Sequence, residues 1–176
     1  IKKFIWKRLL VMKDKVLDYI KNILEVPRNE YSGMSVCPFA KKERETDNIF
    51  IDIIGDNNSF MECMDKFIKT DKNSAVFIQE GDVDLPEAYT KPYQKFLNSL
   101  LKENNLNHWK ALCINPNDKL DVDGFNARAL APCFLVLIND KKDIYFAHKK
   151  IQETKYYDKM SNKYKNYLGV KSNKNE

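Results

Sequence analysis

The 176-residue chain has little of several residues on which common functional motifs depend. It has five glycines and contains neither a GxGxxG fingerprint nor a P-loop, which leaves little room for loops that cradle phosphates. Its two histidines, His108 and His148, are few for a zinc or iron site. No apolar run approaches the roughly 18 residues that a membrane-spanning helix needs. We therefore expect no metal, no cofactor and no membrane span.

Cysteine is also scarce, and its spacing excludes the usual frameworks. None of the four cysteines forms a CxxC pair. Cys113 and Cys133 lie in apolar, strand-like runs, Cys63 lies in a helical pattern, and Cys37 precedes a proline. This usage is typical of a reduced protein without disulfides. We predict an intracellular, cytoplasmic location.

Charge is distributed unevenly around a net value of +5. Residues 1–15 carry six basic residues against one acidic residue, and residues 141–176 carry ten lysines against four acidic residues. Basic ends on an acidic body leave nucleic-acid binding open as a hypothesis. No zinc-finger spacing or RNA-binding signature accompanies them, so we favour solvated ends and do not expect nucleic acid as the partner.

The two ends of the chain differ from its body. Met12 opens the stretch "MKDKVLDYIK", which is typical of a natural start, so residues 1–11 are a candidate upstream or non-native extension. This basic, apolar segment lacks the features of a signal peptide, and a membrane-surface helix is the alternative for it. At the other end we predict a disordered tail over residues 169–176.

Hydrophobic periodicity predicts one α/β domain over residues 12–168. Apolar, β-rich runs alternate with helical patterns, which favours a parallel core with right-handed crossovers. The expected strands are 48–55, 74–80, 110–116, 133–140 and 144–148. The expected helices are 13–26, 57–70, 85–106 and 149–168. The fold class is therefore a mixed sheet of about five strands, with a β-α-β-α-β core, a C-terminal β-hairpin and packed helices.

Within the third helix, two features are specific. Pro92 is expected to split or restart the helix, because proline removes a backbone donor. Phe96, Leu97, Leu100 and Leu101 are expected to form its buried stripe.

Cys37 is the candidate nucleophile. Pro38 at the first position of a short helix would make Cys37 the N-cap, with its sulfur facing free N–H groups that lower a thiol pKa. Lys41 and neighbouring cations would act in the same direction. Thioredoxin-type oxidoreductases and some glutathione transferases use similar Cys-Pro-aromatic starts, and His148 is a conceivable base for the thiol. The alternative is that Cys37 and Pro38 only pack a loop.

Candidate binding residues follow the expected third strand. Asn115 ends this strand, and the polar loop after it carries Asp123, Asn126 and Arg128. In a parallel sheet, ligands bind beyond the carboxyl ends of the strands, where Glu80 and Asp82 would also lie. Arg128 would orient a carboxylate or phosphate. Its alternative role is a salt bridge that anchors the long loop to an aspartate.

Four short motifs occur in a recognisable order along residues 34–148. They are "VCPFAK" at Val36–Lys41, "CINP" ending at Pro116, "NARALAP" with Arg128 four residues before Pro132, and "FLVLIND". In this order the chain resembles an uncharacterised bacterial family, the domain of unknown function 1415 type, with its LCPFAK, FHP and NRSPxP motifs. Asn115, Ala127, Leu130 and Val136 stand where that family has His, Asn, Pro and His. The resemblance implies a shared site and no particular reaction.

These observations support three functional hypotheses. The first is a thiol-dependent enzyme, redox or group transfer, with Cys37 as the nucleophile and a small anionic substrate held by Arg128, Asn115, Lys41, Asn126 and Asp123. The second is a non-catalytic binding or accessory module that uses the same loop edge. The third is a basic nucleic-acid-binding protein. The sequence leaves the oligomeric state open.

Overall fold

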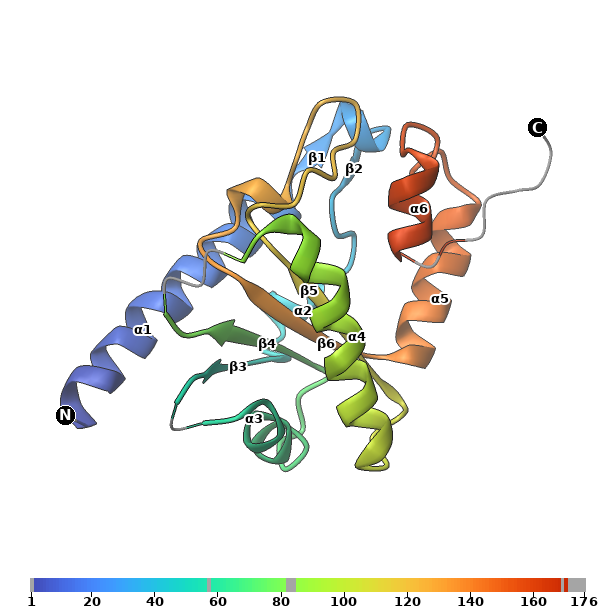
Figure 1. Cartoon of the computed structure of the whole chain (residues 1–176). Coiled ribbons are helices and arrows are strands. Elements are labelled where there is room, and N and C mark those ends of the chain that lie inside the picture. Colours follow the sequence, from blue (N-terminus) through green and yellow to red (C-terminus); the bar gives the residue numbers. More distant parts are fainter. Residues whose placement is uncertain (1, 57, 82–84, 169, 171–176) are drawn as a thin grey trace.

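The structure is a computed structural model that describes residues 2–56, 58–81, 85–168 and 170. A four-stranded mixed sheet with the order β3-β4-β6-β5 lies at its centre, and a small β1-β2 pair lies apart from it (Figure 1). The strands are β1 (Pro27–Arg28), β2 (Met34–Ser35), β3 (Ile49–Ile54), β4 (Ser74–Gln79), β5 (Trp109–Ile114) and β6 (Leu135–Asp140). The α-helices are α1 (Lys2–Tyr19), α2 (Ala40–Glu45), α3 (Phe60–Phe67), α4 (Glu87–Glu103), α5 (Lys141–Gln152) and α6 (Asn162–Leu168). The shorter turns are the π-helical η1 (Ile20–Leu24), which continues α1, and the 3₁₀ turns η2 (Asn29–Tyr31) and η3 (Arg128–Leu130).

The strand directions bring three strand ends to one edge. β3 pairs parallel with β4, whereas β6 pairs antiparallel with both β4 and β5. The strands β3, β4 and β5 therefore point the same way, and their carboxyl ends share an edge of the sheet. The long loop from residue 115 to residue 134 begins at this edge.

The core lies on both faces of the sheet, as the alternation along β4 illustrates. Ala75 and Phe77 pack with α3 and α4 in one cluster, and Val76 and Ile78 pack with α1 and η1 in another. Successive strand residues point to opposite faces, so a strand covered by helices on both sides is apolar throughout. A third cluster joins the long loop and η2 to α5, α6 and the turns between them, and it contains Tyr31, Tyr156 and Tyr164.

The predicted mixed α/β class and single domain are confirmed, but the C-terminal hairpin is wrong. Residues 144–148, expected as a strand, lie inside α5. The side chain of Asp140 caps this helix by accepting a hydrogen bond from the Lys142 N–H at 2.7 Å. Tyr145 and Phe146 are both exposed, which an alternating, half-buried strand would not allow. A helix cap thus ends β6 where the sequence suggested a turn.

The antiparallel strand also lies in a different place. The predicted C-terminal hairpin would add antiparallel pairing at an edge of a sheet of about five strands, but β6 lies between β4 and β5 in a sheet of four strands. Leu135, Val136 and Ile138 are all buried, which is typical of a central strand.

Other expectations concern helices and chain ends. α4 is one helix with Pro92 inside it, so the predicted split is wrong, and Phe96 is exposed rather than buried. The helix α1 runs without a break across residue 12. Val170 is buried, and the rest of the predicted tail lies outside the described residues. Within the described ranges, no helix is both long enough and apolar enough to cross a membrane.

Candidate functional site

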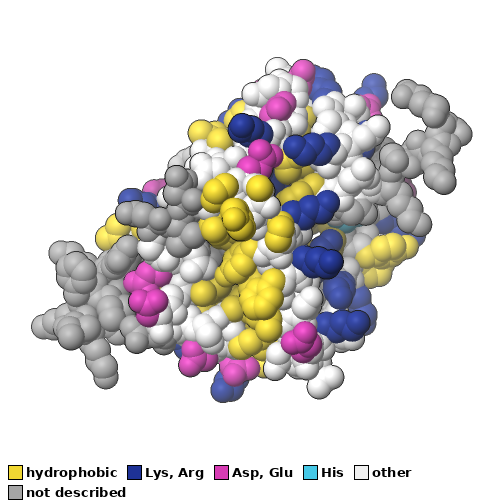
Figure 2. All heavy atoms as spheres, in the orientation of Figure 1, with side chains coloured by type: hydrophobic (Ala, Val, Ile, Leu, Met, Phe, Trp, Pro, Cys, Tyr) yellow, Lys and Arg dark blue, Asp and Glu magenta, His cyan; other side chains and the backbone are white. Residues whose placement is uncertain are grey.

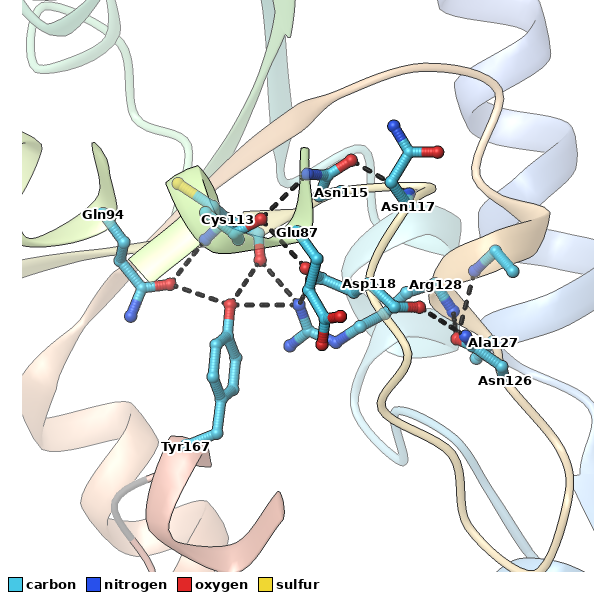
Figure 3. Close-up of polar contacts among 12 residues, drawn as sticks. Glu87, Gln94, Cys113, Asn115, Asn117, Asp118, Asn126, Ala127, Arg128 and Tyr167 are labelled. Carbon is cyan, nitrogen blue, oxygen red and sulfur yellow. Dashed lines mark hydrogen bonds and ion pairs between the residues drawn. The ribbon is translucent and has the colours of Figure 1, made fainter. Parts of the chain in front are cut away.

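Arg128 lies in a buried polar network at the carboxyl-end edge of the sheet (Figure 3). Its Nη1 atom is 2.8 Å from the Cys113 carbonyl oxygen, 2.9 Å from Asp118 Oδ2 and 3.0 Å from the Tyr167 hydroxyl. The side chains of Arg128 and Asp118 are only 5% and 3% exposed. The alternative role that the sequence allowed for Arg128, a salt bridge that anchors the long loop, is therefore confirmed.

The charge of Arg128 is already matched inside the protein. Burial opposes this charge, but Tyr167, Tyr164 and Asp118 outweigh it, so the pKa of the guanidinium is raised. The guanidinium carbon also lies 4.3 Å from the centroid of the Tyr167 ring, a cation–π geometry. An anionic substrate would have to displace Asp118 and leave that carboxylate buried without its partner.

Asn115 belongs to the same network. It is 1% exposed, and its Nδ2 donates to Thr90 Oγ1 at 2.8 Å and to the Leu85 carbonyl at 2.7 Å. The Thr90 hydroxyl in turn donates to Asp118 Oδ1 at 2.9 Å. Asn115 therefore fastens the end of β5 to the start of α4 instead of facing solvent.

Asn126 organises the turn that carries Arg128. Its Nδ2 donates to the Asp118 carbonyl at 2.5 Å, and its Oδ1 accepts from the backbone N–H groups of Arg128 and Ala129 at 3.0 and 3.1 Å. The Asn126 side chain thus holds the backbone at the start of η3 and the turn that carries Arg128.

Asp123 lies away from this network. It occupies a tight turn in which Asp123 and Gly124 both have positive φ, 53° and 84°. Its carboxylate is 3.1 Å from Lys159 Nζ, and its side chain is 58% exposed. Asp123 therefore forms a surface ion pair at the loop tip, with no hydrogen bond to the Arg128 network.

Cys37 lies between β2 and α2 and is not an N-cap. Its N–H donates to the Leu24 carbonyl at 2.9 Å, and its side chain is half-buried against the cluster that contains η1. The helix α2 begins at Ala40, with Phe39 as its N-cap residue. Pro38 lies in the turn before the helix, so the expected N-cap assignment of Cys37 is wrong, although its sulfur does face the Phe39 and Ala40 amides.

The surroundings of the Cys37 thiol do not activate it. Burial raises its pKa, hydrogen bonds from the Phe39 and Ala40 amides oppose this less strongly, and the carboxylates of Glu25 and Glu43 raise the pKa further. Arg44, one of the expected neighbouring cations, is engaged by Glu25, with Nε to Oε1 at 2.6 Å. The net result is a thiol pKa above its ordinary value, the opposite of what an activated thiol requires.

Lys41 and His148, the other candidates for activating the thiol, form no hydrogen bond with Cys37 among the described residues. Lys41 is exposed on α2. His148 is half-buried on α5, and its Nδ1 is 2.5 Å from the Tyr157 hydroxyl. The structure therefore brings Arg128, Asn115 and Asn126 together, whereas Cys37, Lys41 and Asp123 do not share their network.

The sequence missed several members of the network. The Tyr167 hydroxyl of α6 lies 2.9 Å from the Cys113 carbonyl oxygen and 3.2 Å from Gln94 Oε1, and its single proton can be donated to either. The available signal is the alternation of lysine and tyrosine over residues 154–167, which favours a helix with its tyrosines packed inward and its lysines outward. Tyr156 and Tyr164 are buried, but they pack in the third cluster, with the long loop and η2, and not against the sheet.

A groove opens at the same edge, where β4 ends and α4 begins. Its volume is about 430 Å³. We call it the α4 groove. The residues that line it are Gln79, Leu85, Tyr89, Pro92, Tyr93 and Phe96. Tyr89 and Phe96 are 60% and 56% exposed, which is high for large apolar side chains. Figure 2 shows hydrophobic side chains gathered along this face of the molecule. Asp82, expected at this edge, lies outside the described residues.

Hydrogen-bond and aromatic contacts fix the side chains of Tyr93 and Phe96 in the wall of the α4 groove. The Tyr93 hydroxyl donates to Gln79 Oε1 at 3.2 Å, and the Tyr93 ring meets the core residue Phe134 edge to face at 5.7 Å. Phe96 stacks on Tyr93 with ring centroids 6.5 Å apart. Burial raises the pKa of Tyr93, so its hydroxyl remains a donor at neutral pH.

A row of lysines follows the other side of α4. Lys91, Lys95 and Lys102 are exposed, and their spacing places them on one side of the helix, away from the aromatic residues. In Figure 2, basic side chains lie along one side of the apolar stripe. The α4 surface thus has an apolar groove on one side of the helix and a row of lysines on another.

Comparisons with known proteins give no family: no family model, curated protein or solved structure matches the chain. The resemblance to the uncharacterised bacterial family therefore stays a prediction. In the described part of the chain, no three His, Cys, Asp or Glu side chains gather in a way that could hold a metal ion.

Proposed function

We propose that this protein is a non-catalytic binding module whose α4 groove takes an extended peptide segment of another protein. The segment would carry an aromatic or aliphatic anchor with acidic residues beside it. The observation that supports this proposal most strongly is the pair of exposed rings, Tyr89 and Phe96, in a groove of about 430 Å³.

The composition of the groove favours a protein partner. Tyrosine is enriched among residues that dominate binding energy at protein interfaces, and exposed apolar patches with polar borders mark such interfaces. Tyr93 is held by Gln79 and Phe134, so one wall of the groove is ordered before binding. Pre-ordered walls lower the entropic cost of association.

The lysines favour acidic residues in the bound segment. Lys91 and Lys95 are exposed and about one turn apart, on a different side of α4 from the aromatic residues, where a segment that extends around the helix past the groove would meet them. Basic side chains on an interface rim steer an acidic partner and increase its rate of association. Single-stranded nucleic acid also combines with aromatic and basic side chains, but there the backbone follows a charged groove. Here the described residues that line the groove are uncharged and mostly apolar, and the lysines lie on another side of the helix.

The thiol-enzyme hypothesis receives less support from the same geometry. Cys37 has a raised pKa, and Arg128 is buried in an ion pair with Asp118. A non-catalytic binding module requires neither a reactive Cys37 thiol nor an accessible Arg128 guanidinium. The proposal thus keeps the predicted location, the loop edge, and changes the residues that act there.

Selection from a random dodecapeptide phage library against the immobilised protein tests this proposal. We expect enriched peptides to share an aromatic or aliphatic anchor flanked by acidic residues. By fluorescence anisotropy, the synthetic peptide should bind the double variant Tyr89→Ser, Phe96→Ser at least tenfold more weakly than the unchanged protein. The variant Lys91→Glu, Lys95→Glu should weaken binding several-fold and reduce its dependence on salt.

The control is an equally exposed aromatic pair on α5. Tyr145 and Phe146 are 64% and 58% exposed, so Tyr145→Ser, Phe146→Ser removes as much exposed aromatic surface without touching the groove. We expect this variant to bind as the unchanged protein does. Failure to enrich any peptide, equal losses in both double variants, or groove-dependent binding of a labelled poly-U oligonucleotide instead would each overturn the proposal.

A further inference from the structure

The two edge strands of the central sheet, β5 and β3, differ in how far their outward backbone groups are hydrogen-bonded. Along β5, Asn98 of α4 accepts from the Ala111 N–H at 3.0 Å and donates to the Ala111 carbonyl at 2.9 Å. Gln94 accepts from the Cys113 N–H at 2.8 Å, and Arg128 donates to the Cys113 carbonyl. Side chains therefore occupy the outward backbone groups of this edge and block the addition of another strand.

The β3 edge is closed at one end only. The Asn48 carbonyl accepts from the Ser74 N–H and the Ile54 carbonyl accepts from the Glu80 N–H, so the even-numbered residues face β4. The odd-numbered residues therefore direct their backbone groups outward.

At Ile53 these outward groups are occupied, because its N–H donates to Asp52 Oδ1 at 2.9 Å and its carbonyl accepts from Asn58 at 2.6 Å. At Ile49 and Ile51, no hydrogen bond from any described residue meets the outward N–H and C=O groups.

The open segment borders a surface pocket of mixed charge. The pocket has a volume of about 260 Å³ and lies between β3, α1 and α2. Its lining includes Leu17, Ile49 and Ile51 together with charged residues of both signs. The charged residues are Lys13, Asp18, Lys21, Arg44 and Asp47. Arg44 and Asp47 are already paired with Glu25 and Lys72, whereas an identical surface across a two-fold axis would bring both signs of charge to the remaining Lys13, Asp18 and Lys21.

The helix α1 adds an apolar surface on the same side. Leu10 and Val11 lie one turn before Lys13 and are 57% and 48% exposed. Figure 1 shows the first turns of α1 projecting past the body of the molecule. A short peptide added to β3 would leave Leu10 and Val11 uncovered, whereas a second copy could cover both features at once.

We propose that two copies of this chain associate through antiparallel pairing of their β3 strands. A two-fold axis at Phe50 places Ile49 of each copy opposite Ile51 of the other. Residues opposite each other in this register exchange both backbone hydrogen bonds, so the two pairs use every open group of the edge. The projecting α1 helices then pack against the partner copy, and the two sheets become continuous. This inference is independent of the α4 groove.

Sedimentation velocity over a concentration series tests the association. We expect twice the monomer mass at high concentration, and in the dimer we expect slow hydrogen exchange of the Ile49 and Ile51 amides. Ile51→Pro should yield a monomer, because proline removes an outward N–H that the fold of one chain does not use. Leu10→Glu, at a site exposed in the single chain, should also yield a monomer and keep the circular dichroism spectrum.

The matched control is Leu130→Glu, because Leu130 is 50% exposed on η3, far along the chain from β3. This variant should dimerise as the unchanged protein does. A monomer at 100 µM, or a dimer whose mass neither Leu10→Glu nor Ile51→Pro alters, would refute the proposal. A dimer in which the Ile49 and Ile51 amides exchange freely would refute it too.

Discussion

At the scale of single residues, Arg128 and Asp118 decide how the long loop is held. Their ion pair is buried. The same Arg128 Nη1 atom also contacts the Cys113 carbonyl oxygen of β5 and the Tyr167 hydroxyl on α6. Breaking a buried pair by removing one partner leaves an uncompensated charge, and this costs more than the pair itself contributes.

We predict that Arg128→Met lowers the free energy of unfolding by about 3–5 kcal/mol. The double variant Arg128→Met, Asp118→Leu should lose less than the single variant, because neither charge is then left alone. Urea denaturation followed by circular dichroism measures both values. A loss below about 1 kcal/mol in the single variant, the range of an exposed ion pair, would contradict the account.

The second residue-scale prediction concerns Cys37. Because burial raises its pKa, the thiolate fraction at neutral pH is smaller than for a free cysteine, and it increases only at higher pH. Iodoacetamide should therefore label Cys37 more slowly than glutathione between pH 7 and about 9, as measured by mass spectrometry of the peptide. Rapid, selective labelling of native Cys37 near pH 7 would restore the thiol-enzyme hypothesis.

At the scale of elements, α4 connects the groove to the sheet. The same helix presents Tyr89 and Phe96 outward and uses Gln94 and Asn98 to satisfy the backbone of β5. The position of the groove therefore depends on polar contacts that also close an edge strand.

We predict that Asn98→Ala destabilises the protein by about 1–3 kcal/mol, because it leaves the Ala111 N–H and C=O without partners. Ser99→Ala on the exposed side of the same helix is the control and should change the free energy of unfolding by less than about 0.5 kcal/mol. Thermal or urea unfolding measures both variants. Equal effects of the two substitutions would show that the Asn98 contacts contribute nothing specific.

Local sequence signals predicted some elements well and others poorly, for identifiable reasons. The apolar runs of β3, β4 and β5 were clear because both faces of these strands are covered. The start of α5 was missed because Asp140 acts as a helix cap, and Asp followed by charged residues also suits a turn.

The pairing of β6 between β4 and β5 depends on contacts distant in the chain, which no local pattern carries. For the same reason the sequence suggested a salt bridge for Arg128 without identifying the tyrosines around it.

The groove was missed because Phe96 was assigned to the buried stripe of α4. The apolar residues of this helix span more of its circumference than the sheet can cover. Leu97 and Leu101 face the core, while Tyr89 and Phe96 remain outside. An apolar arc wider than one packing face was the available signal that part of this helix stays exposed.

At the scale of the whole molecule, the two proposed surfaces leave the core undisturbed. The α4 groove lies beside the carboxyl end of β4, on the side of the sheet that packs against α3 and α4. The open β3 edge borders the pocket formed with α1 and α2. The exposed residues Tyr89 and Phe96 on one surface, and Leu10 on the other, can therefore be altered without removing buried contacts.

Photo-crosslinking at the groove tests the central claim most directly. A photoreactive benzoylphenylalanine is placed at Tyr89, and separately at the equally exposed Tyr145, and each protein is irradiated with the selected peptide. The account predicts a covalent adduct from position 89, which unlabelled peptide suppresses, and none from position 145. Equal adducts from both positions, or an adduct from position 145 alone, would contradict it.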